Sequence, residues 1–204
     1  MKVVIIDYGV SNLSSIKQSV EFCGGDPLVT ANPDNLSDAT HVILPGVGSF
    51  KDGMENLTSN GWVEPIRKIA TKDRIPFLGI CLGMQFLCDE GFEHGKSKGL
   101  GLVPGEVKKL EPIAPDEKIP HVGWNEVDIV QNHNIFDGIP SGNDFYFVHS
   151  FHFVPKKNEN ILSTTPYCNS FVSSVNKDNV FGTQFHPEKS QRLGLQFITN
   201  FLNL

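Results

Sequence analysis

The sequence predicts an α/β fold, in which helices cover a central, mostly parallel sheet and mixed or antiparallel strands are added in the C-terminal half. Up to Gly91, short apolar runs alternate with amphipathic helix patterns, which is typical of a parallel sheet covered by helices. Beyond Gly91, strand patterns punctuated by glycine and proline follow one another, which favours antiparallel pairing. The chain has 204 residues without a linker or repeat, so we expect residues 1–204 to form a single domain.

The first half contains four strand patterns. Residues 3–7 resemble a fully buried strand, and the following helix has apolar residues at three- and four-residue intervals from Leu13 to Cys23, before Gly24 and Gly25 end it. Further strands are predicted at 27–30, 41–44 and 76–80, and a helical pattern covers about residues 50–72 with a break near Gly61.

The second half consists mainly of predicted strands. They cover residues 101–110, 122–130, 145–154, 161–165, 171–175 and 180–185. The chain then ends in a predicted helix over about residues 191–202, with Leu193, Phe197, Ile198 and Phe201 on one side.

The charge and the N-terminus limit the possible partners. A formal net charge of −6 argues against a nucleic-acid or anionic-membrane surface, because both need clustered basic residues. The apolar run at residues 3–6 is too short for the core of a signal peptide, and no later stretch approaches the length of a membrane span. We therefore expect a cytoplasmic protein that acts on a small molecule or with a partner protein.

Most cysteines and histidines are expected to have packing roles. The four cysteines are widely spaced and form no CxxC pair, so disulfides are not expected. Cys23 and Cys88 lie on the apolar sides of predicted helices, where free cysteines usually pack in the core. His149 and His152 resemble a metal pair, but no third ligand follows at a suitable spacing, so we expect no metal and assign them packing or surface roles.

Cys81 has the sequence context of a nucleophile. It lies in the segment GICLG, which follows a predicted buried strand and opens a helix. This strand-turn-helix context is that of a nucleophile elbow with cysteine in place of serine. Glycines two residues before and after Cys81 permit a tight turn, and a helix N-terminus behind the sulfur favours the thiolate.

His186 and Glu188 are candidates for the base and for the acid that orients it. They lie in the segment HPE after an apolar strand near the C-terminus. Residues two apart on an extended segment point to the same side, so Glu188 can accept a hydrogen bond from the His186 ring and stabilise its protonated form. The triad Cys81, His186 and Glu188 would cleave an amide by covalent catalysis.

The segment Pro45-Gly46-Val47-Gly48 is a candidate oxyanion loop. It follows the predicted strand 41–44, and the carboxyl end of a parallel strand would lie beside the cysteine elbow. Backbone N–H groups of Gly46, Val47 and Gly48, together with that of Leu82, would stabilise the negative oxygen of a tetrahedral intermediate.

Several motifs together resemble one enzyme family. The segments GICLGMQ, QFHPEKS and LPGVGSF look like those of class I, triad-type glutamine amidotransferases. DYGVSNL, GLGLVPGEV, PHVGWNEV and YFVHSF are in addition similar to the glutaminase subunit of imidazole glycerol phosphate synthase. Together they extend from residue 7 to residue 190, so the resemblance covers nearly the whole chain.

The resemblance implies a reaction and a partner. The fold would be the three-layer, flavodoxin-like domain of these amidotransferases, without a cofactor. Glutamine would be cleaved through a thioester on Cys81, and the ammonia would pass to a (β/α)8-barrel cyclase in a heterodimer. The cyclase would use it to form imidazole glycerol phosphate and an aminoimidazole carboxamide ribotide in histidine biosynthesis.

The resemblance also assigns roles to individual residues. Gln85 and Glu93 match positions that hold the glutamine substrate, and Ser150 and Phe151 match positions whose backbone binds it. The residues that match the interface with the cyclase are Asn12, Trp124, Asn125, Tyr146 and Lys189. In the family, the partner is thought to switch the loop that carries the oxyanion donors.

The chain departs from the family pattern at Ser11, in a loop expected to approach the partner, and at Cys168, where the family commonly has glycine. Neither position belongs to the triad. Three other functions stay open: a related glutaminase that supplies ammonia to a barrel partner for sugar amidation in surface polysaccharide, a non-catalytic binding protein, and a self-sufficient cysteine hydrolase. The presence of all three triad residues argues against the non-catalytic interpretation.

Overall fold

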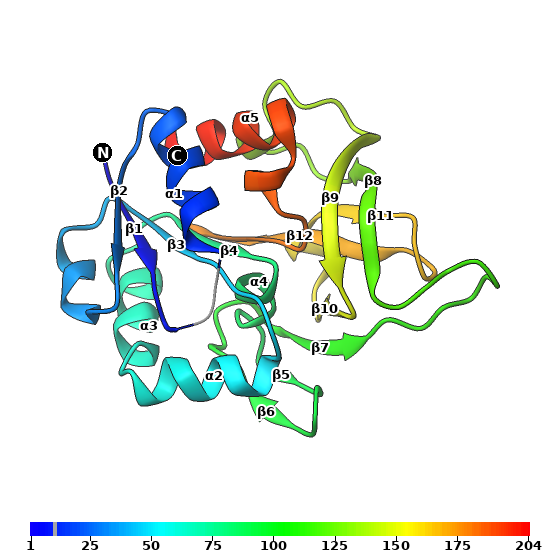
Figure 1. The fold of residues 1–204 in the computed structure, drawn as a ribbon, viewed down its shortest axis with the longest axis horizontal. Coiled ribbons are helices and arrows are strands. Elements are labelled where there is room, and N and C mark those ends of the chain that lie inside the picture. Colours follow the sequence, from blue (N-terminus) through cyan, green and yellow to red (C-terminus); the bar gives the residue numbers. More distant parts are fainter. Residues whose placement is uncertain (10–11) are drawn as a thin grey trace.

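The computed structural model describes residues 1–9 and 12–204, and within them the chain forms two sheets (Figure 1). The larger sheet has the strand order β2-β1-β3-β4-β13-β12-β11-β8-β9, and the smaller has the order β10-β7-β5-β6. Helices lie on both sides of the larger sheet, with α1 and α5 on one side and α2 and α3 on the other (Figure 1). This architecture confirms the predicted α/β fold.

The parallel part of the sheet is built from the first half of the chain and one late strand. Its strands are β1 (Lys2–Ile6), β2 (Asp26–Thr30), β3 (His41–Leu44), β4 (Phe77–Ile80) and β13 (Val180–Thr183). The helices are α1 (Leu13–Phe22), α2 (Phe50–Ser59), α3 (Val63–Thr71) and the C-terminal α5 (Gln191–Leu202). A short 3-10 helix, η1 (Pro33–Asp38), connects β2 to β3.

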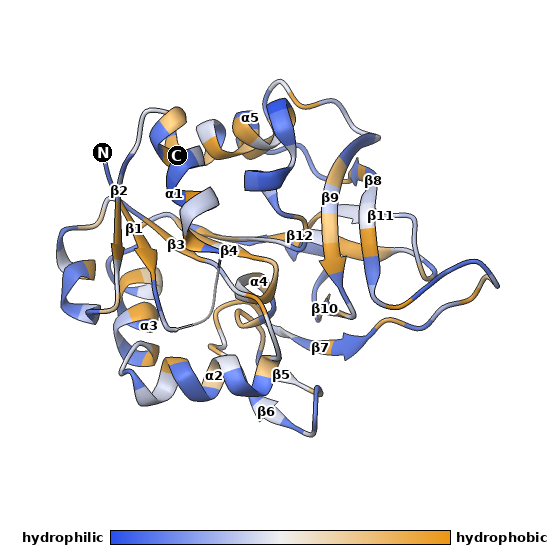
Figure 2. Ribbon diagram, in the orientation of Figure 1, coloured by the Kyte–Doolittle hydropathy of each residue, from blue (hydrophilic) through white to orange (hydrophobic). Residues whose placement is uncertain are grey.

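Strand β1 shows why these segments are continuous apolar runs. Val3 and Ile5 pack in the cluster that contains residues of α1 and α5, whereas Val4 and Ile6 pack in the cluster that contains residues of α2 and α3. All four side chains are fully buried, because a parallel strand between two helix layers has no solvent face. Figure 2 shows the same distribution, with hydrophobic residues gathered on β1, β3 and β4.

The second half adds antiparallel strands, as predicted. Strands β12 (Phe171–Lys177), β11 (Ile161–Thr165), β8 (His121–Ile129) and β9 (Asn143–His149) extend the sheet beyond β13. The smaller sheet contains β5 (Glu90–Gly91), β6 (Ser97–Lys98), β7 (Gly105–Lys109) and β10 (Phe151–Pro155). The remaining 3-10 helices are η2 (Asn134–Phe136), η3 (Asn158–Asn160) and η4 (Pro187–Lys189).

The predicted single strand 145–154 is wrong, because the chain changes sheets at Ser150. Strand β9 pairs with β8 in the larger sheet, whereas β10 pairs with β7 in the smaller one. Ser150 lies between them, and its carbonyl oxygen accepts a hydrogen bond from the N–H of Leu110 at 2.9 Å. No glycine or proline marks this change, although the chain bends at Ser150 between the two strands.

The helix expected after Cys81 is a single turn, α4 (Leu82–Gln85). The chain then turns toward β5, and Cys88 is fully buried in that turn rather than on a helix. The dipole of one helical turn is small, so the predicted stabilisation of the thiolate by a helix is weaker than expected. Strands β5 and β6 were not predicted, because two residues are too few to show an alternating pattern.

In the part of the chain that the structure describes, none of the helices has the length and apolar character needed to cross a membrane.

Candidate active site

The backbone at Cys81 forms a sharp turn between β4 and α4. Its φ of 55° and ψ of −109° are unusual for a residue with a side chain, and such conformations persist only where the surroundings hold them. Here the N–H of Cys81 donates to the carbonyl oxygen of Thr183 on β13 at 2.7 Å, and the carbonyl oxygen of Cys81 accepts from the N–H of Gln85 at 3.2 Å. The sulfur is thereby presented at the carboxyl edge of the parallel sheet.

The two glycines around Cys81 are required by close packing. A Cβ atom on Gly83 would overlap the carbonyl oxygen of Leu44 at the end of β3, and a Cβ atom on Gly79 would lie 2.5 Å from the carbonyl oxygen of Gly83. Both obstacles are backbone atoms that cannot move aside without shifting a strand or the turn. The prediction that small residues make the turn possible is therefore explained by the contact between β3, β4 and α4.

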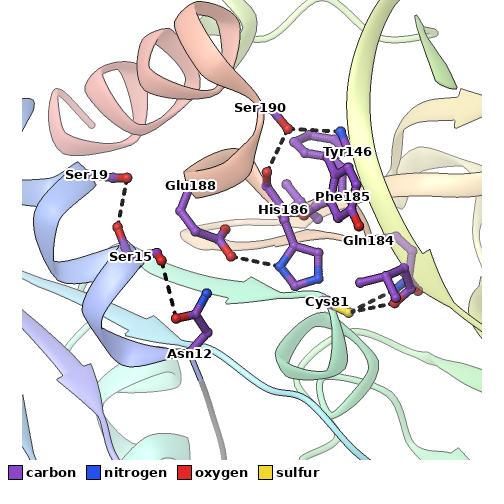
Figure 3. Close-up of polar contacts among 12 residues, drawn as sticks. Asn12, Ser15, Ser19, Cys81, Tyr146, Gln184, Phe185, His186, Glu188 and Ser190 are labelled. Atoms are coloured by element: carbon purple, nitrogen blue, oxygen red, sulfur yellow. Dashed lines mark hydrogen bonds and ion pairs between the residues drawn. The ribbon is translucent and has the colours of Figure 1, made fainter. Parts of the chain in front are cut away.

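His186 and Glu188 follow β13 and form a buried pair (Figure 3). The distance from His186 Nδ1 to Glu188 Oε1 is 2.8 Å, and the two side chains are 3% and 1% exposed. Since the carboxylate accepts from Nδ1–H, the second ring nitrogen, Nε2, is the one directed toward Cys81 (Figure 3). Nε2 has no hydrogen-bond partner among the described residues.

Two opposing effects act on the His186 ring. Burial lowers its pKa, but the neighbouring Cys81 sulfur and the Glu188 carboxylate raise it, and the net change is upward. A raised pKa means that the site favours the protonated ring. The arrangement therefore favours the imidazolium form of His186 beside the Cys81 sulfur.

The loop after β3 borders the cavity that contains Cys81. Val47 and Gly48 border the same cavity as Cys81 and Leu82, and within the described residues the N–H groups of Val47, Gly48 and Leu82 have no hydrogen-bond acceptor. Gly48 has a φ of +100°, which favours glycine. Gly46, which was predicted to belong to the oxyanion loop, does not border the cavity. It packs against Tyr8, and a Cβ atom added to Gly46 would lie 2.7 Å from the Tyr8 hydroxyl.

The cavity has a volume of about 180 Å³ and gathers most of the predicted site residues. It is lined by Val47, Gly48, Cys81, Leu82, Gln85, Glu93, Val148, His149, Ser150, Phe151 and His186. Gln85 Nε2 donates to the carbonyl oxygen of Phe151 at 2.9 Å. Glu93 Oε2 accepts from the N–H of Phe50, the first residue of α2, at 2.6 Å. All four residues assigned to substrate binding therefore reach one cavity.

The residues predicted to face a partner differ in their exposure. Trp124 on β8 is 47% exposed and makes an edge-to-face contact with Tyr146 on β9. Lys189 Nζ lies 5.7 Å from the centre of the Tyr146 ring. Asn12 is exposed at the start of α1, near Glu188 in Figure 3, and Asn125 is half-buried on β8.

Of the two departures from the family pattern, Ser11 and Cys168, the structure describes Cys168. Ser11 lies outside the described residues. Cys168 is partly buried in the turn between β11 and β12, with a φ of 49°, and its N–H donates to Glu117 Oε1 at 2.7 Å. Cys168 does not line the cavity that holds Cys81.

Three residues of the site were not predicted. Val148 and His149 line the cavity, and the Gln184 side chain contacts the Cys81 sulfur. A signal for Gln184 exists in the sequence, since it lies two residues before His186 on an extended segment and therefore points to the same side. His149 was assigned to packing, because without the fold nothing places its strand beside Cys81.

Comparison with known proteins identifies the family. The family described as glutamine amidotransferase class-I matches residues 4–203. Imidazole glycerol phosphate synthase subunit HisH 1 of Campylobacter jejuni strain RM1221 is 44% identical over 202 residues, which cover 99% of this chain and 100% of that protein. The HisH subunit of Methanocaldococcus jannaschii is 48% identical over 200 residues, covering 98% of both chains.

Solved structures support the fold. PurLQS from Thermotoga maritima aligns with a TM-score of 0.76 at 21% identity, over 99% of this chain and 97% of that chain. A glutamine amidotransferase from the same organism aligns with a TM-score of 0.69 at 18% identity, over 95% of this chain and 78% of that chain. The chain therefore belongs to the class I glutamine amidotransferases and, within them, to the HisH subunits of imidazole glycerol phosphate synthase.

Proposed function

We propose that this chain is the glutaminase subunit of an imidazole glycerol phosphate synthase and that Cys81, His186 and Glu188 hydrolyse the side-chain amide of glutamine. The observation that carries the proposal is the cavity that Cys81, His186 and the candidate oxyanion residues Val47, Gly48 and Leu82 line together. Those are a nucleophile, a proton carrier and an anion-stabilising site, which amide cleavage requires.

In the first half of the reaction, the Cys81 thiolate attacks the amide carbon of glutamine. The negative oxygen that results accepts hydrogen bonds from the N–H groups of Val47, Gly48 and Leu82. His186 donates its Nε2 proton to the amide nitrogen, the C–N bond breaks, and ammonia leaves. Cys81 is left as a thioester of glutamate.

In the second half, water attacks the thioester. Neutral His186 takes a proton from the water at Nε2, and Glu188 stabilises the imidazolium through the 2.8 Å hydrogen bond. The C–S bond then breaks, which releases glutamate and restores the thiolate. The sum is glutamine and water converted to glutamate and ammonia.

The other cavity residues suit the substrate. The free glutamine molecule carries an α-ammonium group, for which the Glu93 carboxylate supplies the opposite charge. Gln85 has both N–H donors of its amide engaged by protein oxygens, so its carbonyl oxygen is available to accept from the substrate. The backbone of Ser150 and Phe151 would complete the pocket.

The proposed partner is a (β/α)8-barrel cyclase that receives the ammonia in a cytoplasmic heterodimer. The HisH relatives are named as subunits of a synthase, which supports a partnered role for this chain. The face proposed for the cyclase contains Asn12, Trp124, Asn125, Tyr146 and Lys189. Trp124 and its neighbour Val122 are 47% and 55% exposed, and exposed apolar residues of this kind mark protein interfaces.

We further propose that residues 1–204 form one amidotransferase domain. The larger sheet supports this, since β13 from the C-terminal region pairs with β4 from the first half. The catalytic residues come from the ends of these two strands, so neither half of the chain would form the site alone.

The test is glutamate release from glutamine by the purified chain, with and without a histidine-pathway cyclase and its ribotide ligand, and with Cys81→Ala as the control. Strong stimulation by the cyclase that disappears in Cys81→Ala supports the proposal. Cys81-dependent hydrolysis without stimulation keeps the glutaminase but assigns the ammonia to another acceptor, such as a sugar. No Cys81-dependent hydrolysis under any condition refutes the proposed chemistry.

A further inference from the structure

Gln184 is a buried residue beside the nucleophile that the mechanism above does not use. It follows β13, is fully buried, and is held by a hydrogen bond from its backbone N–H to the carbonyl oxygen of Ser173 at 2.8 Å. Its side-chain Nε2 lies 3.6 Å from Cys81 Sγ (Figure 3). Its Oε1 accepts from Gln85 Nε2 at 3.0 Å. The amide thus bridges the sulfur and a residue of the substrate cavity.

The direction of the Gln184 amide follows from its surroundings. The oxygen and nitrogen of a side-chain amide are similar in shape, so their assignment must come from the hydrogen-bond network. The carbonyl oxygen of Phe151 can only accept, so Gln85 must present its NH2 group there at 2.9 Å. The second hydrogen of that NH2 group reaches Gln184, which must present its oxygen, and its own NH2 group is then directed at Cys81.

The carbonyl oxygen of Phe151 also accepts a hydrogen bond from His149. His149 Nδ1 lies 2.8 Å from the oxygen of Phe151, so Nδ1 carries the proton and donates it. His149 Nε2 then accepts from His121 Nδ1 at 3.0 Å, and His121 Nε2 accepts from Asn125 Nδ2 at 3.2 Å. Burial lowers the pKa of His149 to about 3 and that of His121 to about 4, so both rings stay neutral and keep these directions at neutral pH.

The direction of the Gln184 amide affects the protonation of Cys81, because few other groups contact its sulfur in the described part of the chain. Apart from Gln184, the hydrogen-bond partner of Sγ within the described residues is the carbonyl oxygen of Val148 at 3.8 Å. That oxygen accepts from a thiol S–H but repels a thiolate, whereas the Gln184 N–H favours the thiolate. Without the Gln184 donor, the Val148 oxygen would oppose the stabilisation of the thiolate by the His186 imidazolium.

We propose that Gln184 is a further catalytic residue, whose amide donates a hydrogen bond to the Cys81 sulfur and holds it as a thiolate, in a direction set by the Gln85 and Phe151 hydrogen bonds. When the proton moves from Cys81 Sγ to His186 Nε2, the charge left on sulfur is stabilised by the Gln184 N–H. This inference rests on the proposed function for the role of Cys81, but the hydrogen bond itself can be measured without glutamine.

The experiment compares the wild-type chain with Gln184→Met and Gln184→Leu, which keep a side chain of similar size but have no donor. Each protein is alkylated with iodoacetamide between about pH 5 and about pH 10, and modification of the Cys81 peptide is followed by mass spectrometry. Loss of a hydrogen bond to an ionised group should move the midpoint of the pH profile upward by about 1 unit and slow alkylation at neutral pH about tenfold.

Asn200→Leu is the matched control. Asn200 is a buried amide on α5 whose Nδ2 donates to two backbone carbonyl oxygens, and it does not line the cavity. This variant loses buried hydrogen bonds without touching the sulfur, so its Cys81 profile should match the wild type. Circular dichroism and thermal unfolding establish that each variant is folded.

Two results would overturn the inference. The first is that a folded Gln184→Met or Gln184→Leu variant has the same midpoint of the Cys81 alkylation profile as the wild type. The second is that Asn200→Leu moves this midpoint upward as much as the Gln184 variants do. The proposed function is judged separately by glutamine hydrolysis of the wild-type chain. If that hydrolysis depends on Cys81 while the Gln184 variants keep the wild-type midpoint, only the role of Gln184 is refuted.

Discussion

Substitution of Glu188 by glutamine removes the negative charge behind His186 and keeps the size of the side chain. The glutamine oxygen can still accept from His186 Nδ1 at the 2.8 Å distance, so the ring keeps its orientation. Its new NH2 group, however, replaces Glu188 Oε2, which is buried without a partner among the described residues. The variant should therefore lose the charge of the pair and about 1 to 3 kcal/mol of folding stability.

The effect on catalysis follows from the burial of the pair. Because both side chains are almost inaccessible to water, the charged hydrogen bond is weakly screened, and its loss should cost about 2 to 3 kcal/mol of imidazolium stabilisation. If this loss is fully expressed in the transition state, kcat/KM falls about 30- to 150-fold. The loss should appear mainly in kcat, since Glu188 does not line the substrate cavity.

The pH profile should change in a defined direction. The Glu188 carboxylate helps to raise the pKa of His186, so the imidazolium is present at low pH and is lost as pH rises through the raised pKa. Without the carboxylate that pKa falls, and the alkaline limb of kcat/KM should move to lower pH by about 2 units.

The assay is the pH dependence of glutamine hydrolysis in the presence of the cyclase, with Glu64→Gln as the matched control. Glu64 pairs with Arg67 on the surface, and its side chain is 81% exposed, so this variant should behave as the wild type. A Glu188→Gln variant that is folded and has an unmoved alkaline limb, or one that changes KM alone, would refute the reasoning.

Three further predictions concern the elbow, the partner face and acid stability. Gly83→Ala places a Cβ atom against the carbonyl oxygen of the last residue of β3, so hydrolysis should fall at least about 100-fold and the thermal midpoint should drop, as measured by calorimetry. Trp124→Ala should weaken cyclase binding about tenfold or more in calorimetric titration while leaving the thermal midpoint nearly unchanged. The control Ile113→Ala, at a site 69% exposed, should change neither the binding nor the midpoint. Normal binding by Trp124→Ala would exclude this residue from the interface. Burial lowers the pKa of His121 to about 4 and that of His149 to about 3, so the unfolded state takes up protons before the folded state as pH falls below about 6.5. Each ring should then cost about 1.4 kcal/mol of folding stability per pH unit, down to its folded pKa. In denaturant titrations at acid pH, the folding stability of His149→Gln should fall less steeply with pH than that of the wild type.

Local sequence patterns were sufficient to predict most of the fold and to propose the triad. The run from Val3 to Ile6 predicted a strand buried on both faces, and the structure places helices on both sides of it. The GxCxG segment predicted a tight turn, although part of the reason is tertiary, since a Cβ atom on Gly83 would overlap the carbonyl oxygen of Leu44 on β3. Hydrophobic periodicity and backbone sterics act over a few residues, so they can be read from a short segment.

Features that depend on pairing between distant segments could not be predicted in this way. The strand pattern across Ser150 is continuous, yet the chain leaves one sheet for another there, because β8 and β7 offer different pairing edges. The length of α4 was overestimated for the same reason, since the chain must turn toward β5 after one helical turn.

In the site, too, some features follow from local sequence and others from contacts between distant segments. The residue types and spacing around Cys81, His186 and Glu188 led to the proposed chemistry, because a nucleophile and its base must be those kinds of side chain in those local conformations. The direction of the Gln184 amide and the role of His149 depend on the carbonyl oxygen of Phe151, which comes from a different strand. A hydrogen bond needs both partners within about 3 Å, and that distance exists only once β9, β10 and β13 are folded together.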